Sequence, residues 1–167
     1  MIESVTPARC VEFAIRTEEI GAELYGQLAR KFASDGELAE LFRDLGRDEA
    51  QHAEQFRALH ARFVQQFQGR TIPVDQANYV RAMAMADVFS GPKGLATGSD
   101  GIRTRDDALE RALNLEKATL AYYQALREIT GEDEALDALI AVERRHVLKV
   151  MQLLVTGARF RGFADSF

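Results

Sequence analysis

The two halves of this sequence resemble each other, and this internal repeat restricts the chain to a fold with two similar halves. Residues 14–28, AIRTEEIGAELYGQL, align with residues 112–126, ALNLEKATLAYYQAL. In each half a Glu-x-x-His segment follows, at residues 49–52 and at residues 143–146. The distance along the chain between the two motifs differs between the halves by about one helical turn, which a shorter turn between helices would absorb. Each half is therefore expected to form the same supersecondary unit.

Apolar residues recur every three or four positions in both halves, a spacing that is typical of helices. In the first half this spacing begins at Pro7, breaks at residues 34–36 and ends at Gly69, which predicts two helices. Ser34 is followed three residues later by Glu37, a pattern that predicts a capping box at the start of the second helix. Because the break is only a few residues long, the two helices are expected to pack as antiparallel neighbours.

The second half predicts another helical hairpin. One helix begins near Thr104 and ends near Gly131, and the next continues from there to about Gly157. A connection over about residues 69–104 separates the hairpins, and residues 79–89 within it could form a short helix. No segment alternates with a period of two, so no sheet is expected. The predicted fold is all-α: a ferritin-like antiparallel four-helix bundle with one long crossover between helices 2 and 3.

Size and charge exclude several classes of protein. The 167 residues fit one domain over residues 1–167, and a net charge of −5 argues against a nucleic-acid partner. The single cysteine, Cys10, excludes an internal disulfide and any metal site built from several thiolates, and it favours a reducing compartment. No apolar run approaches the ~18–20 residues of a membrane span, and the first residues lack the pattern of a secretory signal. We therefore expect a cytoplasmic protein without a membrane partner.

Polar residues interrupt the apolar face of every predicted helix near its middle. They are four glutamates and two histidines: Glu18, Glu49, His52, Glu116, Glu143 and His146. The histidines follow glutamates at a spacing of three, so each Glu-x-x-His pair projects from one side of its helix. All six side chains are expected to point into the interior of one bundle. His60 has no equivalent in the other half and is not expected to join them.

Four carboxylates in one interior require positive charge close by. Burying an unpaired carboxylate costs several kcal/mol, and four of them also repel one another. Two divalent cations would balance four ionised glutamates, and oxygen ligands with some imidazole suit iron or manganese, and zinc less selectively. One glutamate from each of two helices, with Glu-x-x-His from each of the other two, is the ligand set of ferritin-like di-iron and di-manganese proteins. The sequence therefore predicts a dinuclear metal site.

These motifs resemble the ferritin-like superfamily and, within it, the rubrerythrin group. The resemblance covers roughly residues 8–68 and 105–156, and its first-helix motif, AIRTEEIGAELYGQLA, is repeated in the second half. It implies a ligand assignment in which Glu49 and Glu143 bridge the metals, Glu18 and His52 bind one metal, and Glu116 and His146 bind the other.

The resemblance also concerns residues around the ligands. Tyr25 and Tyr123 each follow a ligand glutamate by about two helical turns, so they are expected to be core aromatics whose hydroxyl groups bind a ligand carboxylate. Many relatives have an aspartate directly before each Glu-x-x-His as a partner of a histidine. Asp48 fits this pattern, but the equivalent residue in the second half is Val142. Rubrerythrins often have a further glutamate where this chain has Thr119, which argues against the ligand exchange associated with peroxide.

The function implied by this resemblance is that of a non-haem di-iron oxidoreductase. Two iron ions, or manganese or zinc, would form the cofactor, and hydrogen peroxide or dioxygen would be reduced. The sequence lacks the paired cysteines of a rubredoxin-like domain, so a separate electron-donor protein would be a partner. A homodimer or higher homo-oligomer is expected. Three alternatives stay open: oxidation of iron for storage or transfer, a structural metal-binding bundle without turnover, and hydroxylation of an organic substrate.

Overall fold

The computed structural model describes residues 6–73, 75 and 98–164, with side chains up to residue 157. The described helices are α1 (Pro7–Lys31), α2 (Gly36–Gln66), α4 (Arg105–Thr130) and α5 (Glu134–Ala164). No strand occurs in these residues, and the antiparallel all-α bundle predicted from the sequence is confirmed. The predicted helix at residues 79–89 lies outside the described residues.

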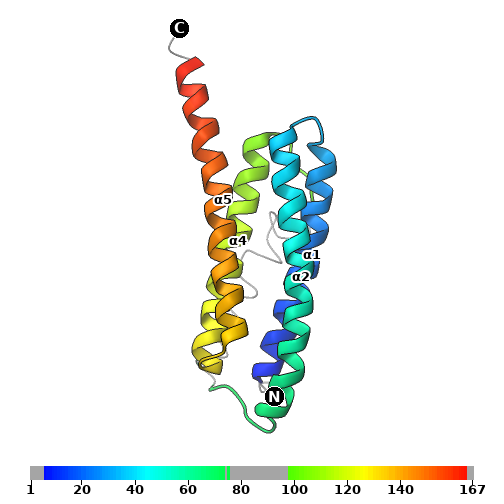
Figure 1. The fold of residues 1–167 in the computed structure, drawn as a ribbon, viewed down its shortest axis with the longest axis vertical. Helices are drawn as coiled ribbons and strands as arrows, with labels where there is room; N and C mark the ends of the chain where they lie inside the picture. The colour runs from blue at the N-terminus through cyan, green and yellow to red at the C-terminus, as the bar shows by residue number, and fades with distance from the viewer. Residues whose placement is uncertain (1–5, 74, 76–97, 165–167) are drawn as a thin grey trace.

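The four helices form two hairpins that lie side by side with their long axes aligned (Figure 1). Helix α2 ends where α1 begins, whereas α4 begins at the opposite end of the bundle (Figure 1). The connection between α2 and α4 therefore has to cover the length of the bundle, as the predicted crossover requires. Helices pack most extensively within each hairpin, and α1 meets α4 and α2 meets α5 less extensively.

Short polar residues start the helices. Thr6 caps α1 by accepting a hydrogen bond from the Arg9 amide at 3.3 Å, directly before Pro7, where the sequence predicts that the helix begins. Thr104 and Asp107 form a capping box at the start of α4, with hydrogen bonds of 2.9 and 3.1 Å. Gly131 ends α4 with a φ of 83°, a left-handed conformation that favours glycine.

The start of α2 differs from the prediction. The capping residue is Asp35, not Ser34, and its Oδ1 accepts from the Leu38 amide at 3.0 Å. Both residue types are good caps, so the choice is made by tertiary structure. The guanidinium of Arg105, at the start of α4, contacts the other Asp35 oxygen and fixes the carboxylate in its capping position. Glu37 therefore pairs with Arg105 instead of completing a capping box.

The end of α5 also differs from the prediction. The helix continues through Gly157 to Ala164 and extends past the level at which α4 begins (Figure 1). A single glycine inside a helix costs about 1 kcal/mol and does not stop it without a second signal such as proline.

The core consists of two apolar clusters, one towards each end of the bundle. The first includes Val11, Phe56 and Phe63, and the second includes Leu28, Phe42 and Leu109. The polar residues predicted from the sequence lie between the two clusters, so apolar side chains separate them from both ends of the bundle. Among the described helices, none combines the length and the hydropathy needed to cross a membrane.

Candidate metal centre

All six residues predicted to be metal ligands lie together in the middle of the bundle. Each helix contributes: α1 and α4 one glutamate each, and α2 and α5 one Glu-x-x-His pair each. Their side chains are almost fully buried, with relative exposures of 4% or less: Glu18, Glu49, His52, Glu116, Glu143 and His146. Because these charged groups occupy core positions, their own interactions have to compensate for the lost hydration.

The six residues form two overlapping groups. In each group, one candidate ligand atom per residue lies within 4.8 Å of the others. The first group, which we call the His52 position, consists of Glu18, Glu49, His52 and Glu143. The second group, the His146 position, consists of Glu49, Glu116, Glu143 and His146. Glu49 and Glu143 belong to both groups, so the arrangement suits two adjacent metal ions that share two carboxylates. This agrees with the assignment implied by the resemblance, which stays a prediction.

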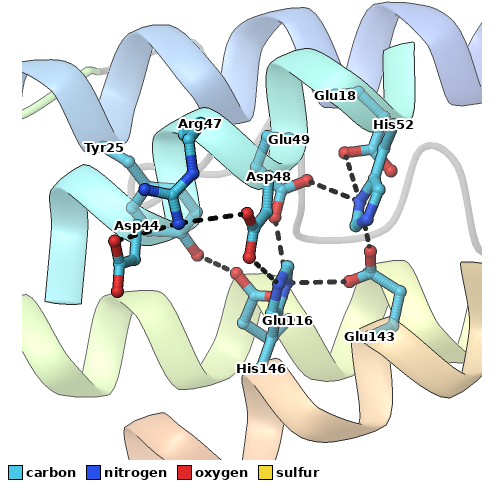
Figure 2. A network of polar contacts seen from close by, with 10 residues as sticks. All are labelled: Glu18, Tyr25, Asp44, Arg47, Asp48, Glu49, His52, Glu116, Glu143 and His146. Atoms are coloured by element: carbon cyan, nitrogen blue, oxygen red, sulfur yellow. Dashed lines mark hydrogen bonds and ion pairs between the residues drawn. The ribbon is translucent and has the colours of Figure 1, made fainter. Parts of the chain in front are cut away.

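Both imidazoles direct Nδ1 towards the carboxylates (Figure 2). His52 Nδ1 lies 2.9 Å from an oxygen of Glu143 and 3.7 Å from one of Glu18. His146 Nδ1 lies 3.2 Å from an oxygen of Glu49 and 3.3 Å from one of Glu116. The two rings face each other, with centroids 5.5 Å apart.

Hydrogen bonds within the cluster do not satisfy these groups. Among the described side chains, seven buried nitrogen and oxygen atoms have no hydrogen-bond partner of suitable geometry, and all seven belong to the six candidate ligands. They include Nδ1 of both histidines and both oxygens of Glu143. Orphaned buried polar atoms are rare in native proteins, and here every one of them is a good metal ligand. The residues therefore fit a pair of divalent cations.

The pKa values of the buried side chains also indicate that the cluster needs positive charge. Burial, followed by the nearby charge of Glu49, raises the pKa of Glu18, and the same two effects raise the pKa of Glu116 to about 8. Burial opposes the charged form of His52, but contacts with Glu143 and Glu18 outweigh it and raise the pKa to about 12. Without metal, protons thus supply the positive charge that the four carboxylates need, and metal ions would displace them.

Two tyrosines donate hydrogen bonds to the cluster. The Tyr25 hydroxyl donates to Glu116 Oε1, and the Tyr123 hydroxyl donates to Glu18 Oε1. Both rings are fully buried, and burial is the main reason that the pKa of each hydroxyl is raised, so both stay protonated donors. The predicted hydrogen bonds to carboxylates are confirmed, but each tyrosine contacts the glutamate of the other hairpin. These bonds therefore also tie α1 to α4.

Asp48 contacts a histidine from outside the cluster. Its Oδ2 lies 3.3 Å from His146 Nε2, and Arg47 Nη2 lies 3.5 Å from its Oδ1 (Figure 2). Arg47 in turn contacts Asp44 at 3.0 Å. Asp44 and Arg47 were not among the residues predicted from the sequence, although their spacing of three on one helix is typical of an ion pair. His60 lies outside the centre, as expected, and its Nε2 is 3.1 Å from Glu12.

The fold and the buried cluster together define a four-helix bundle whose core holds a candidate metal site of glutamates and histidines. Comparison with protein families agrees: the sequence model of the rubrerythrin family matches residues 10–154. The chain belongs to the rubrerythrin family. No curated protein and no solved structure matches it significantly.

Proposed function

We propose that this protein is a non-haem di-iron oxidoreductase that reduces hydrogen peroxide or dioxygen in the bundle core. The observation that supports the proposal most strongly is the set of seven orphaned atoms on two overlapping groups that share Glu49 and Glu143. Two ferrous ions, when bound, supply two electrons, which with two protons suffice to convert hydrogen peroxide to two waters. Oxygen-rich ligands with one imidazole per position suit this metal.

The chain's own residues would hold, orient and isolate the metal pair. Tyr25 donates a hydrogen bond to one oxygen of Glu116, and Tyr123 donates one to one oxygen of Glu18. The other oxygen of each glutamate has no hydrogen-bond partner and would be available to bind a metal ion. The apolar clusters on both sides of the centre would exclude water along the bundle axis. Electrostatic interactions within the centre would therefore be stronger than in water. Cys10 alone cannot build a cysteine-ligated electron-transfer centre, so we propose that a separate protein donates electrons.

An anaerobic titration of the metal-free protein with Fe²⁺, followed by hydrogen peroxide or air, tests this proposal. We expect about two irons per chain, as in dinuclear sites, and a near-ultraviolet band of the ferric pair after oxidation. Glu116→Gln should lose one iron and most of the oxidation. Glu128→Gln, an exposed glutamate on the same helix, is the matched control and should behave as the parent. Binding of fewer than two irons, or of two irons without oxidation, would favour a structural metal site instead.

Oxidation of iron for storage or transfer is the second candidate. The observation in its favour is Thr119, which is buried one turn after Glu116 where rubrerythrins often have a further glutamate. The two functions differ in what happens beyond two irons per chain. An iron-handling protein should continue to oxidise added Fe²⁺, and electron microscopy should show a large hollow assembly. A peroxide or dioxygen reductase should instead need a donor protein for each new turnover.

A further inference from the structure

The two halves of the centre are equivalent at nearly every position. Glu18 corresponds to Glu116, and each accepts a hydrogen bond from a tyrosine of the other hairpin. The two Glu-x-x-His pairs correspond as well, and both histidines point Nδ1 inward. From these residues alone, the two metal positions would be expected to bind equally well.

Asp48 breaks this equivalence. It lies on α2 directly before Glu49 and reaches across to His146 on α5. The equivalent residue, directly before Glu143 on α5, is Val142, which is half-buried and has no hydrogen-bonding side chain. Within the described residues the carboxylate contacts of His52 are made through Nδ1, on the inner side of the ring. In the part of the chain that the structure describes, no carboxylate contacts His52 Nε2 as Asp48 contacts His146 Nε2.

A carboxylate at this place changes how well a histidine binds metal. A histidine that binds through Nδ1 carries its proton on Nε2, and an acceptor there fixes the tautomer and the ring orientation and makes Nδ1 more basic. Asp48 Oδ2 is in position to accept a hydrogen bond from the Nε2–H of His146. Arg47 contacts the other oxygen of Asp48 and holds the carboxylate in place. Loss of such a partner typically weakens metal binding by about 10–100-fold.

We propose that the two metal positions are unequal: the His146 position binds first and holds its ion, while the His52 position binds more weakly and exchanges its ion. This inference rests on the metal binding in the proposed function, but not on which oxidant is reduced. It assigns Asp48 the role of a positioning residue that acts through His146. Metal entry, and any iron that leaves the centre again, would then pass through the His52 position.

Calorimetric titration of the metal-free full chain with Fe²⁺ under anaerobic conditions tests the inequality. We expect two binding steps whose dissociation constants differ by about 10–100-fold. His52→Ala should remove the weaker step and leave the tighter one. Asp48→Asn should weaken the tighter step by a similar factor and bring the two steps together, without changing the number of irons bound. Val142→Asp should strengthen the weaker step.

Asp44→Asn is the matched control. It removes a carboxylate from the same surface network, but Asp44 contacts Arg47 and not His146. It should therefore leave both steps nearly unchanged. Should Val142→Asp fail to fold, which its circular dichroism would show, the comparison of Asp48→Asn with Asp44→Asn still decides the question. The inference would be overturned if the two binding steps of the parent had equal dissociation constants. It would also be overturned if the two dissociation constants of Asp48→Asn differed by as much as those of the parent. Either result would leave the proposed function intact. Absence of iron binding would overturn both.

Discussion

The ends and the middle of this bundle follow opposite rules. At the ends, apolar side chains such as Phe42 and Phe63 are buried against one another and contribute to folding directly. In the middle, six titratable side chains are buried with seven unsatisfied atoms. The ends therefore have to stabilise the fold, and the middle is stable only with protons or metal ions in it. The centre therefore destabilises the metal-free protein, and bound metal ions would restore that stability.

The largest expected effect concerns the apolar ends. Phe63 is 1% exposed and packs against Phe67 with ring centroids 5.0 Å apart, far along α2 from the cluster. Phe63→Ala should lower the free energy of unfolding by about 3–5 kcal/mol, because it removes buried surface and leaves a cavity. Urea denaturation measures this. The neighbouring residue Val64 is 48% exposed, and Val64→Ala should change stability by less than about 0.5 kcal/mol. Equal effects of the two substitutions would contradict the core described above.

Each bound metal ion should stabilise the middle by a smaller amount than Phe63 stabilises the end. A redox-inactive ion such as Zn²⁺, present at 100 times its dissociation constant, should add about 2.7 kcal/mol for each position it fills. The comparison is made by urea denaturation with Zn²⁺ and with a chelator. In Glu143→Gln, Zn²⁺ should raise the free energy of unfolding much less than in the parent, because Glu143 belongs to both positions.

Glu128→Gln, with its exposed side chain, should keep the full stabilisation by Zn²⁺. If Zn²⁺ stabilises Glu143→Gln as much as the parent, the ions bind elsewhere on the protein and the two positions are wrongly assigned.

The sequence predicted the middle of the molecule better than its edges, for a physical reason. A glutamate inside an apolar helical face, such as Glu18, is conspicuous because burying it is costly. The partner of Tyr25 could not be predicted, because its hydroxyl reaches Glu116 across the bundle and the packing of α1 on α4 decides that contact. The cap of α2 depended in the same way on Arg105, 70 residues along the chain.

The smallest expected effect concerns this cap, a half-buried ion pair that contrasts with the almost fully buried charges of the centre. The hydrogen bond from Arg105 and, less strongly, the one from the Leu38 amide lower the pKa of Asp35 below its ordinary value, although its limited burial acts in the opposite direction. A carboxyl whose pKa is lower in the folded state stabilises the protein above its unfolded pKa of about 3.9, and this stabilisation is lost as the pH falls through the folded value. At pH 7, Asp35→Ala should therefore cost about 1 kcal/mol, the usual value of a helix cap.

In urea denaturation the difference between the parent and Asp35→Ala should narrow as the pH falls below about 4. Asp35→Asn separates the two contributions of this side chain, because its amide oxygen can still cap α2 but carries no charge for Arg105. At pH 7 the free energy of unfolding of Asp35→Asn should lie between those of the parent and of Asp35→Ala. In acid, its difference from Asp35→Ala should shrink less than the difference between the parent and Asp35→Ala. A difference between parent and alanine variant that stays constant from pH 7 to pH 3 would show that the charge of Asp35 contributes nothing. The joint between the two hairpins at this end would then rest on apolar packing and on the contact of Arg105 with Glu37.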